Sequence, residues 1–462
     1  MRAVYQKYKP YYLESLKLAI PVIISNVGHT AVQMSDTIIV GHFAGTVSLA
    51  AVSTVNSLFM VPLVIGMGIS YGLTPLIAQN NGRKNHKECG LLLSNSLFLN
   101  ILSGIILFCG IYFGTMLLIG HLDQSREVVT EAKPYLFLLS LSLIPLLIFN
   151  TFKQFAEGLG FTKQAMMISI WGNLINILLG IIFVKGLFGI QPMGIRGVGY
   201  STLIDRCLMA AVMGIYVFRS KNFKTYLTDF AIKNIDRLRG IQIMKIGAPV
   251  AMQYTFEISA FGGAALLVGT IGVVAQAAHQ VTITMASMTY MMASGIGAAA
   301  AIKSGNYFGV SDHRNLRLAA ISNYHIVLLF MSFTAVIFAL GRHLLPWIIT
   351  SDEEVITIAS QLLIIAAFFQ LFDGAQVVGL GVLRGMGDVN VPTVITFLAY
   401  WVIGLPVGYL LGIKFNLGVY GVWYGLVLGL GTASVLLFAR FNVLSKSHKI
   451  KPAIPIVAKD QK

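Results

Sequence analysis

Long apolar runs separated by short polar segments dominate the pattern of the chain. A helix needs about 20 mostly apolar residues to cross a bilayer, and by that measure we expect twelve spans, six in each half. The runs are continuous, whereas a barrel strand has about ten residues of alternating polarity, so the spans are expected to be helices. The expected spans are 13–38, 52–77, 91–118, 135–152, 163–185, 196–218, 241–268, 276–301, 316–340, 356–379, 392–413 and 419–440.

The second half of the chain repeats features of the first. Ile20–Val22 is matched 228 positions later by Ala248–Val250, and Gly158–Gly160 is matched 227 positions later by Gly385–Gly387. Because six spans make up each copy, both copies have the same orientation, which is the parallel-repeat plan of some transporters. We therefore predict an all-α integral membrane protein of two six-helix bundles. Its predicted parts are an N-terminal lobe (1–218), a cytoplasmic linker (219–240), a C-terminal lobe (241–442) and a cytoplasmic tail (443–462).

The composition agrees with a membrane protein. Of the 462 residues, 56% are hydrophobic and 11% are charged, and the mean hydropathy is +0.77, so the bilayer is the expected solvent. The net charge of +15 does not indicate nucleic acid, because the basic residues lie in short segments between apolar runs. The three cysteines are scattered and have no metal-ligand spacing, so we expect three free thiols.

The distribution of Lys and Arg predicts the orientation. If the N-terminus, the even-numbered loops and the C-terminus lie on one side, that side carries 26 basic residues and the other side carries six, with Arg206 inside a span. Basic residues concentrate on the cytoplasmic side, so both termini are expected there. The N-terminal segment lacks the apolar core and cleavage site of a secretory signal, so the first span should be retained. We expect a multi-pass protein of the bacterial inner membrane, and a monomer.

Four acidic residues, Asp36, Asp205, Glu257 and Asp373, fall well inside the expected spans. An ionised carboxylate in hydrocarbon costs at least a few kcal/mol, so such acids usually face a cavity or a partner. Asp205 precedes Arg206, and such a neighbouring pair either satisfies its charges locally or lies near the membrane interface, so Asp205 is left outside the expected site. Asp36, Glu257 and Asp373 have no Lys or Arg within a helical turn, so each is expected to hold a proton or a cation.

The repeat relates these acids to one another. Glu257 corresponds to His29 at an offset of 228, and Asp36 lies seven residues after His29, on nearly the same helix face. Asp36 and Glu257 should therefore face one cleft at different depths. Asp373 lies in the tenth span, so the C-terminal lobe holds two of these acids and the N-terminal lobe holds one. This inequality suits a division of labour in which one group of acids binds the coupling cation and another contacts the substrate.

Other polar and sulfur-containing residues have two interpretations each. Asn173, Asn176 and Thr202 either reach Asp36 across a lobe cavity or form hydrogen bonds between helices. Met288 and Met292, in the Met-rich stretch of the eighth span, either line an adaptable apolar pocket or pack against lipid and core. The sequence contains no GxxxxGK[ST] loop and no HExxH motif, so we expect neither an enzyme nor a cofactor, and an ion gradient must supply the energy.

Several motifs resemble those of the multidrug and toxic compound extrusion family across nearly the whole chain. They are AIPV (19–22), Asp36 followed by Gly41, TPLIAQNNG (74–82), EGLG (157–160), Glu257 and LRGMGDVNVPT (383–393). Asp36, Glu257 and Asp373 together are similar to the NorM-like branch. The resemblance implies two six-helix bundles that export cationic, aromatic drugs in exchange for Na+ or H+, with these three acids serving cation coupling and drug binding.

The chain departs from the family pattern at two positions. Gly180 stands four residues after Asn176, where other branches often have an aspartate, which weakens a Na+ site in the N-terminal lobe. Phe369 stands four residues before Asp373, where some members have a tyrosine, which removes a possible hydroxyl ligand. Glu257 and Asp373 are then the expected Na+ ligands, and whether Na+ or H+ is the coupling ion stays open.

Two other functions fit a chain with many spans. A flippase for lipid-linked precursors or polysaccharides, of the same superfamily, would be expected to line its cavity with basic groups for an anionic pyrophosphate, whereas most of the ionisable groups here are acidic. A channel or receptor also has many spans, but a parallel six-plus-six repeat with a charged linker favours alternating access.

Overall fold

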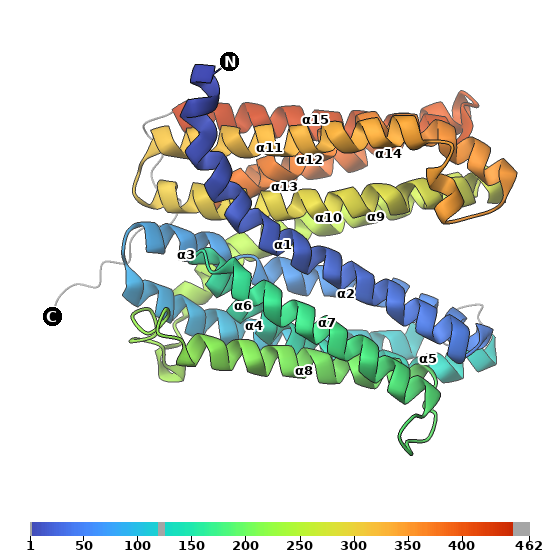
Figure 1. The fold of residues 1–462 in the computed structure, drawn as a ribbon, viewed down its shortest axis with the longest axis horizontal. Helices are drawn as coiled ribbons and strands as arrows, with labels where there is room; N and C mark the ends of the chain where they lie inside the picture. The colour runs from blue at the N-terminus through green and yellow to red at the C-terminus, as the bar shows by residue number, and fades with distance from the viewer. Residues whose placement is uncertain (1, 119–124, 447–462) are drawn as a thin grey trace. The chain divides into compact units, whose positions relative to one another are not determined.

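The computed structural model describes residues 2–118 and 125–446, and within these ranges it contains helices and no strand (Figure 1). The helices of the first half are α1 (Arg2–Phe43), α2 (Thr46–Ser70), α3 (Leu73–Gly82), α4 (His86–Leu118), α5 (Arg126–Leu141), α6 (Leu143–Gly158), α7 (Thr162–Lys185) and α8 (Ile195–Arg219). A short 3-10 helix, η1 (Ile232–Asn234), lies in the segment between the halves.

The second half begins with α9 (Arg237–Gly269). It continues through α10 (Val273–Gly309), α11 (His313–Gly341), the 3-10 helix η2 (Leu345–Ile348) and α12 (Glu353–Gly385). The next span changes its helical pitch, and consists of α13 (Asn390–Phe397), the π-helical η3 (Leu398–Gly404), α14 (Leu405–Tyr409) and the π-helical η4 (Leu410–Lys414). The described chain ends with α15 (Gly418–Lys446).

Eleven helical stretches in the described residues are long and apolar enough to cross a membrane. Three of them join several helices: Val47–Gly82, Arg126–Gly158 and Asn390–Lys414. The remaining predicted span, 241–268, lies in α9, which is 33 residues long but carries Gln253 and Glu257 in its middle. The predicted helical membrane fold is confirmed. The helices are longer than the expected spans, because hydropathy detects only their apolar central part.

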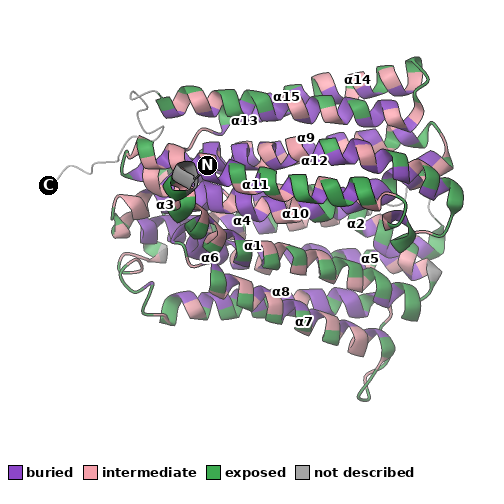
Figure 2. Ribbon diagram, turned by 45° about the horizontal axis from the view of Figure 1, so that its top comes forward, coloured by how far each residue is buried: buried purple, intermediate pink, exposed green. Residues whose placement is uncertain are grey.

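Exposed residues recur along the helices (Figure 2), and many of them are large and apolar. On α11, Leu329 is 76% exposed and Leu340 is 81% exposed, with Phe333 between them on the same side. On α7, Trp171 and Leu178, seven residues apart, are 63% and 60% exposed. A soluble protein rarely exposes such continuous apolar stripes, so these faces are suited to contact lipid.

The chain packs as two compact units. Unit 1 contains residues 1–20, 78–83 and 256–462, and unit 2 contains residues 21–77 and 84–255. Most of the predicted C-terminal lobe lies in unit 1 and most of the predicted N-terminal lobe in unit 2. The part of α1 up to residue 20, the end of α3 and the first half of α9 pack with the opposite half of the chain. The lobe boundaries 1–218, 219–240 and 241–442 stay a prediction, and most of the predicted tail lies outside the described residues.

In unit 1, α12 contacts α10, α11 and α15, and these four helices run side by side in Figure 1. Trp423, Tyr400 and Leu430 are fully buried in the core between them. In unit 2, α8 contacts α5, α6 and α7, and α4 packs on α6. A second apolar core there includes Val40, Val55 and other side chains of α1, α2, α5 and α8.

The two halves repeat in backbone conformation as well as in sequence. Gly160, after α6, has a φ of +89°, and Gly387, after α12, has a φ of +80°, and glycine adopts this region without steric cost. Lys84 and Ser311, also 227 residues apart, have φ values of 59° and 58°. Equivalent helices therefore end in equivalent turns, which supports the predicted duplication.

Glycines bring the last two spans of unit 1 into backbone contact. Gly404, Gly408 and Gly412 recur every four residues on one span, and Gly421, Gly425 and Gly429 do so on α15. A Cβ on Gly429 would meet the Ala399 carbonyl oxygen at 2.7 Å. Small residues at such spacing are the usual means of close helix packing in membranes.

Candidate functional site

In unit 2, Asp36 of α1 is half-buried and lies within electrostatic range of Arg206 and Asp205 on α8. The buried Tyr135 of α5 lies within electrostatic range of Asp36 and Arg206. Among the described residues, Asp36 Oδ1 has no hydrogen-bond partner. Arg206 is distant in sequence from Asp36 but comes within electrostatic range of it in the packed helices.

Asp205 does not form an ion pair with its neighbour in the described structure, although the sequence suggested local pairing. Adjacent residues on a helix point in different directions, and the Arg206 guanidinium instead donates to Ser142 Oγ at 2.7 Å. Asp205 is buried, its Oδ1 has no hydrogen-bond partner in the part of the chain that is described, and it interacts with the Asn176 amide. Asp205 and Arg206 therefore belong to the polar group around Asp36.

Asn173, Asn176 and Thr202 are all buried between α1, α7 and α8. Asn176 Nδ2 donates to Thr202 Oγ1 at 3.4 Å, which is the interhelical hydrogen bond that the sequence allowed. A Cβ on Gly28 would come within 2.7 Å of Asn173 Nδ2, so Asn173 lies against α1. These residues connect α7 to the helices that carry Asp36 and Asp205.

A buried ion pair lies on α6 in the same unit. Lys153 Nζ is 3.9 Å from Glu157 Oε1, and it donates to Ser25 Oγ at 3.4 Å. His29 of α1 is within electrostatic range of Lys153 and Arg206. The interior of unit 2 therefore holds acidic and basic groups within electrostatic range of one another.

A cavity of about 550 Å³ opens between α1 and α2. Thr37 of α1 and Ser53, Asn56 and Ser57 of α2 supply its polar lining. Thr37 is the neighbour of Asp36, so α1 presents Thr37 to this cavity and Asp36 to α8. The cavity is large enough for a small organic molecule.

In unit 1, Glu257 of α9 and Asp373 of α12 are buried and within electrostatic range of each other. Tyr400 of η3 interacts with both carboxyl groups. Arg384, near the end of α12, is distant in sequence from Glu257 but lies within electrostatic range of it. The two acids that the sequence assigned to one lobe are thus brought together, with a phenol hydroxyl beside them.

The Tyr400 hydroxyl also donates to Gln376 Oε1 at 2.9 Å, and Gln376 is buried one helical turn after Asp373. Tyr400 lies in a π-helical segment, and such segments occur often at functional sites because they shift side chains out of α-helical register. Phe369 is buried one turn before Asp373, where its ring packs against Phe261 and Trp423.

Met288 and Met292, which the sequence suggests as possible pocket residues, lie outside the group formed by Glu257, Asp373 and Tyr400. Met288 is 44% exposed and Met292 is half-buried, and no described contact connects either residue to the acids. Residues 2–118 and 125–446 contain no cluster of three His, Cys, Asp or Glu side chains that suits a metal ion. Any cation at Glu257 and Asp373 would thus take further oxygens from neutral groups such as Tyr400 and Gln376.

Sequence reasoning missed Tyr400 and Gln376. A signal for Gln376 was its spacing of three residues from Asp373, which puts the two on one helix face. Tyr400 had no comparable signal, because its position depends on how the span from 390 to 414 packs against α9 and α12.

Two parallel six-helix repeats are one of the plans on which membrane transporters are built. The MatE family model matches the chain twice, at residues 21–182 and 249–410, and the chain belongs to this family. The two matches are 228 residues apart, which confirms the predicted repeat.

Named relatives agree with this assignment. The chain is 32% identical to the multidrug resistance protein NorM of Aliivibrio fischeri, covering 96% of each chain. It is also 32% identical to the multidrug resistance protein MdtK of Yersinia pseudotuberculosis, covering 96% of this chain and 97% of that protein. These relatives are named as resistance proteins and not as enzymes, in agreement with the prediction that the chain is not an enzyme.

Solved structures share the fold. An outward-facing multidrug resistance MATE family transporter of the MOP superfamily aligns with a TM-score of 0.88 at 20% identity, covering 95% of this chain and 97% of that one. The eukaryotic MATE transporter AtDTX14 aligns with a TM-score of 0.85 at 21% identity, and the alignment covers 96% of this chain and 97% of that one. These likenesses concern the fold.

Proposed function

We propose that the protein is a secondary active multidrug exporter, which moves cationic, aromatic organic compounds outward in exchange for Na+ or H+ by alternating access. The family and the names of its relatives support export of drugs. The proposed coupling site is Glu257 and Asp373, with Asp36 and its neighbours contributing in the N-terminal half.

The observation that carries this proposal is the close grouping of Glu257, Asp373 and Tyr400. Two carboxyl groups inside a membrane domain need a counter-charge or a proton for each, and Arg384, which is within electrostatic range of Glu257, supplies one positive charge for the two. A cation from either side of the membrane satisfies the remaining charge. A coupling ion and a cationic drug that compete for these carboxylates produce exchange, because the binding of one disfavours the other.

Na+ is the coupling ion that we favour, with H+ as the rival. Carboxylate, phenol and amide oxygens are hard ligands, and Tyr400 supplies the hydroxyl that Phe369 lacks. Inward movement of one monovalent charge gains about 2.3 kcal/mol per 100 mV of inside-negative potential. In favour of H+, two neighbouring carboxyl groups in a low dielectric readily share a proton.

The basic groups of the N-terminal half argue against a flippase for anionic lipid-linked precursors. Arg206 interacts with Asp36 and Asp205, and Lys153 pairs with Glu157. A pyrophosphate needs cations that are available to it, whereas these two are matched by carboxylates inside the same unit. The excess of acids favours a cationic substrate.

Drug efflux in cells that lack other pumps tests the proposal. Glu257→Gln and Asp373→Asn should each reduce efflux of a fluorescent organic cation by at least tenfold, at equal amounts of protein in the membrane. Glu354→Gln is the matched control, since Glu354 is exposed in the first turn of α12. Wild-type efflux in both site variants would show that the assigned site is wrong.

A further inference from the structure

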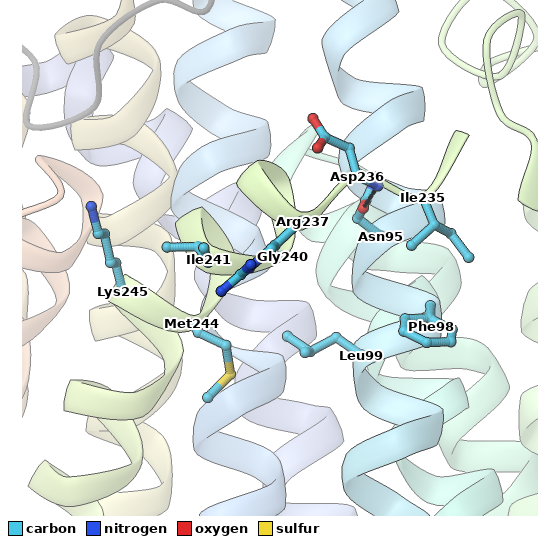
Figure 3. Close-up of a pocket in the computed structure, with 10 residues that line it drawn as sticks. All are labelled: Asn95, Phe98, Leu99, Ile235, Asp236, Arg237, Gly240, Ile241, Met244 and Lys245. Atoms are coloured by element: carbon cyan, nitrogen blue, oxygen red, sulfur yellow. Dashed lines mark hydrogen bonds between the residues drawn. The ribbon is translucent and has the colours of Figure 1, made fainter. Parts of the chain in front are cut away.

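A second cavity, of about 470 Å³, lies in unit 2 where the segment between the halves enters α9 (Figure 3). It is lined by α4, by the residues before α9 and by the first turns of α9. It lies outside the residues around Asp36 and outside the group around Glu257. The predicted span of α9 begins at residue 241, so this cavity lies at the level where a bilayer changes from hydrocarbon to headgroups.

The wall of the cavity is mainly apolar. Phe98 is 48% exposed and Ile241 is 40% exposed, and Leu99 and Met244 complete the apolar surface. Figure 3 shows Phe98 and Leu99 on α4 facing α9, and Met244 at the same end of the cavity. In that view the Asp236 carboxylate and the Lys245 amine lie on different sides of the cavity, with Ile235 beside Asp236 and Ile241 beside Lys245. Basic and apolar side chains therefore line the cavity together.

Arg237 and Arg239 are two residues apart but have different roles. Arg239 forms a two-point ion pair with Glu88, at 2.8 and 3.0 Å, and also bonds to Asp236, and these contacts raise the pKa of its guanidinium. Arg237 lines the cavity and is exposed. In Figure 3 its guanidinium points between the helices, towards Met244. Arg239 therefore anchors the segment before α9, and Arg237 is available to a ligand.

Lys245, two helical turns after Arg237, is the second basic lining residue. Neither Arg237 nor Lys245 forms an ion pair with any residue in 2–118 or 125–446. The one acidic lining residue, Asp236, already has partners for both oxygens, since Oδ1 accepts from Leu238 N and Oδ2 from Arg239. The cavity therefore has an excess of unpaired positive charge.

The walls are held in place by hydrogen bonds. Asn95 of α4 accepts from Asp236 N at 2.7 Å and donates to the Asn234 carbonyl at 3.3 Å. Ser94 Oγ accepts from Ala231 N at 3.2 Å. A Cβ on Gly90 would collide with the Tyr226 carbonyl oxygen, so the segment crosses α4 in backbone contact. A ligand would bind here without first ordering this segment.

We propose that this cavity binds an anionic phospholipid, whose headgroup contacts Arg237 and Lys245 and whose acyl chain lies along Phe98, Leu99 and Met244. Basic pockets between membrane helices are a known means of holding acidic headgroups. The bilayer supplies a ligand that has both the charge and the apolar chain that this lining requires. A cationic drug would be repelled by the two basic groups, so the site is separate from the proposed export function.

Native mass spectrometry of the full-length protein, purified with equal amounts of phosphatidylglycerol and phosphatidylcholine, tests the proposal. Wild-type protein should retain phosphatidylglycerol preferentially. Arg237→Gln combined with Lys245→Gln should reduce that preference by roughly thirtyfold, because each basic residue near an anionic headgroup contributes about fivefold. The matched control is Lys221→Gln combined with Lys224→Gln, two exposed lysines of the same segment that do not line the cavity.

Three results would overturn the proposal: an unchanged preference in the cavity variant, an equal loss in both double variants, or competition by inorganic phosphate as strong as that by the lipid. If the cavity variant does not fold, Arg237→Gln alone replaces it. The single variant should lose about fivefold, and an unchanged preference would count against the site.

Discussion

The hydroxyl of Tyr400 donates a hydrogen bond of 2.9 Å to Oε1 of Gln376. The bond joins the π-helical part of the eleventh span to the helix that carries Asp373, and the same phenol interacts with Glu257 and Asp373. One tyrosine therefore connects three helices at the proposed coupling site.

Tyr400→Phe should reduce transport by several-fold to about tenfold, because it removes one buried hydrogen bond of about 1 kcal/mol and one candidate oxygen ligand. Uptake of a fluorescent cation into inverted vesicles measures the effect. Tyr409→Phe is the control, since Tyr409 is 40% exposed on the same span. Equal rates for wild type and Tyr400→Phe would mean that the phenol has only a packing role.

Arg206→Gln should destabilise the protein by roughly 1–3 kcal/mol, because it removes the charged hydrogen bond to Ser142 Oγ and a cation within electrostatic range of Asp36 and Asp205. Adding Asp36→Asn to Arg206→Gln should recover part of the loss, since one uncompensated charge is then removed. Thermal unfolding of the purified single and double variants gives the comparison. A double variant no more stable than Arg206→Gln would contradict the assigned interaction.

Much of the fold was predictable, but the partners of the acids were not. Twelve spans and two parallel copies follow from apolar run length and from motifs such as Gly158–Gly160, which need only local sequence. Arg206 near Asp36 and Tyr400 near Glu257 depend on how distant helices pack, which hydropathy does not encode. Asp205 and Arg206 interact electrostatically but form no ion pair in the described structure, because adjacent side chains on a helix diverge.

Gly425→Ala should destabilise unit 1 by roughly 1–3 kcal/mol, because the added methyl would collide with the backbone of Gly408 and Gly404, which cannot move aside as a side chain can. Gly431→Ala, on the same helix, is the matched control, since its Cβ would meet only the Phe372 ring, at 3.8 Å. The unfolding midpoints of the two variants should differ clearly. Equal midpoints would show that the helices are not in backbone contact.

The predicted orientation gives a labelling pattern. In a Cys207→Ala background, Asn222→Cys should react with an impermeant thiol reagent only after the cells are opened, because 26 basic residues mark that side as cytoplasmic. Phe188→Cys, at a residue that is 88% exposed between α7 and α8, should react in intact cells. Labelling at Asn222→Cys in intact cells would reverse the orientation.

The central claim is that the coupling ion and the drug compete for Glu257 and Asp373. The most direct measurement is release of a bound fluorescent cation from purified protein, at fixed pH, on titration with NaCl or with KCl at matched ionic strength. We predict greater release by NaCl in the wild type and no difference between the salts in Asp373→Asn. Identical release in both salts by wild-type protein, with release that follows pH through the neutral range, would contradict Na+ coupling and identify a proton antiporter.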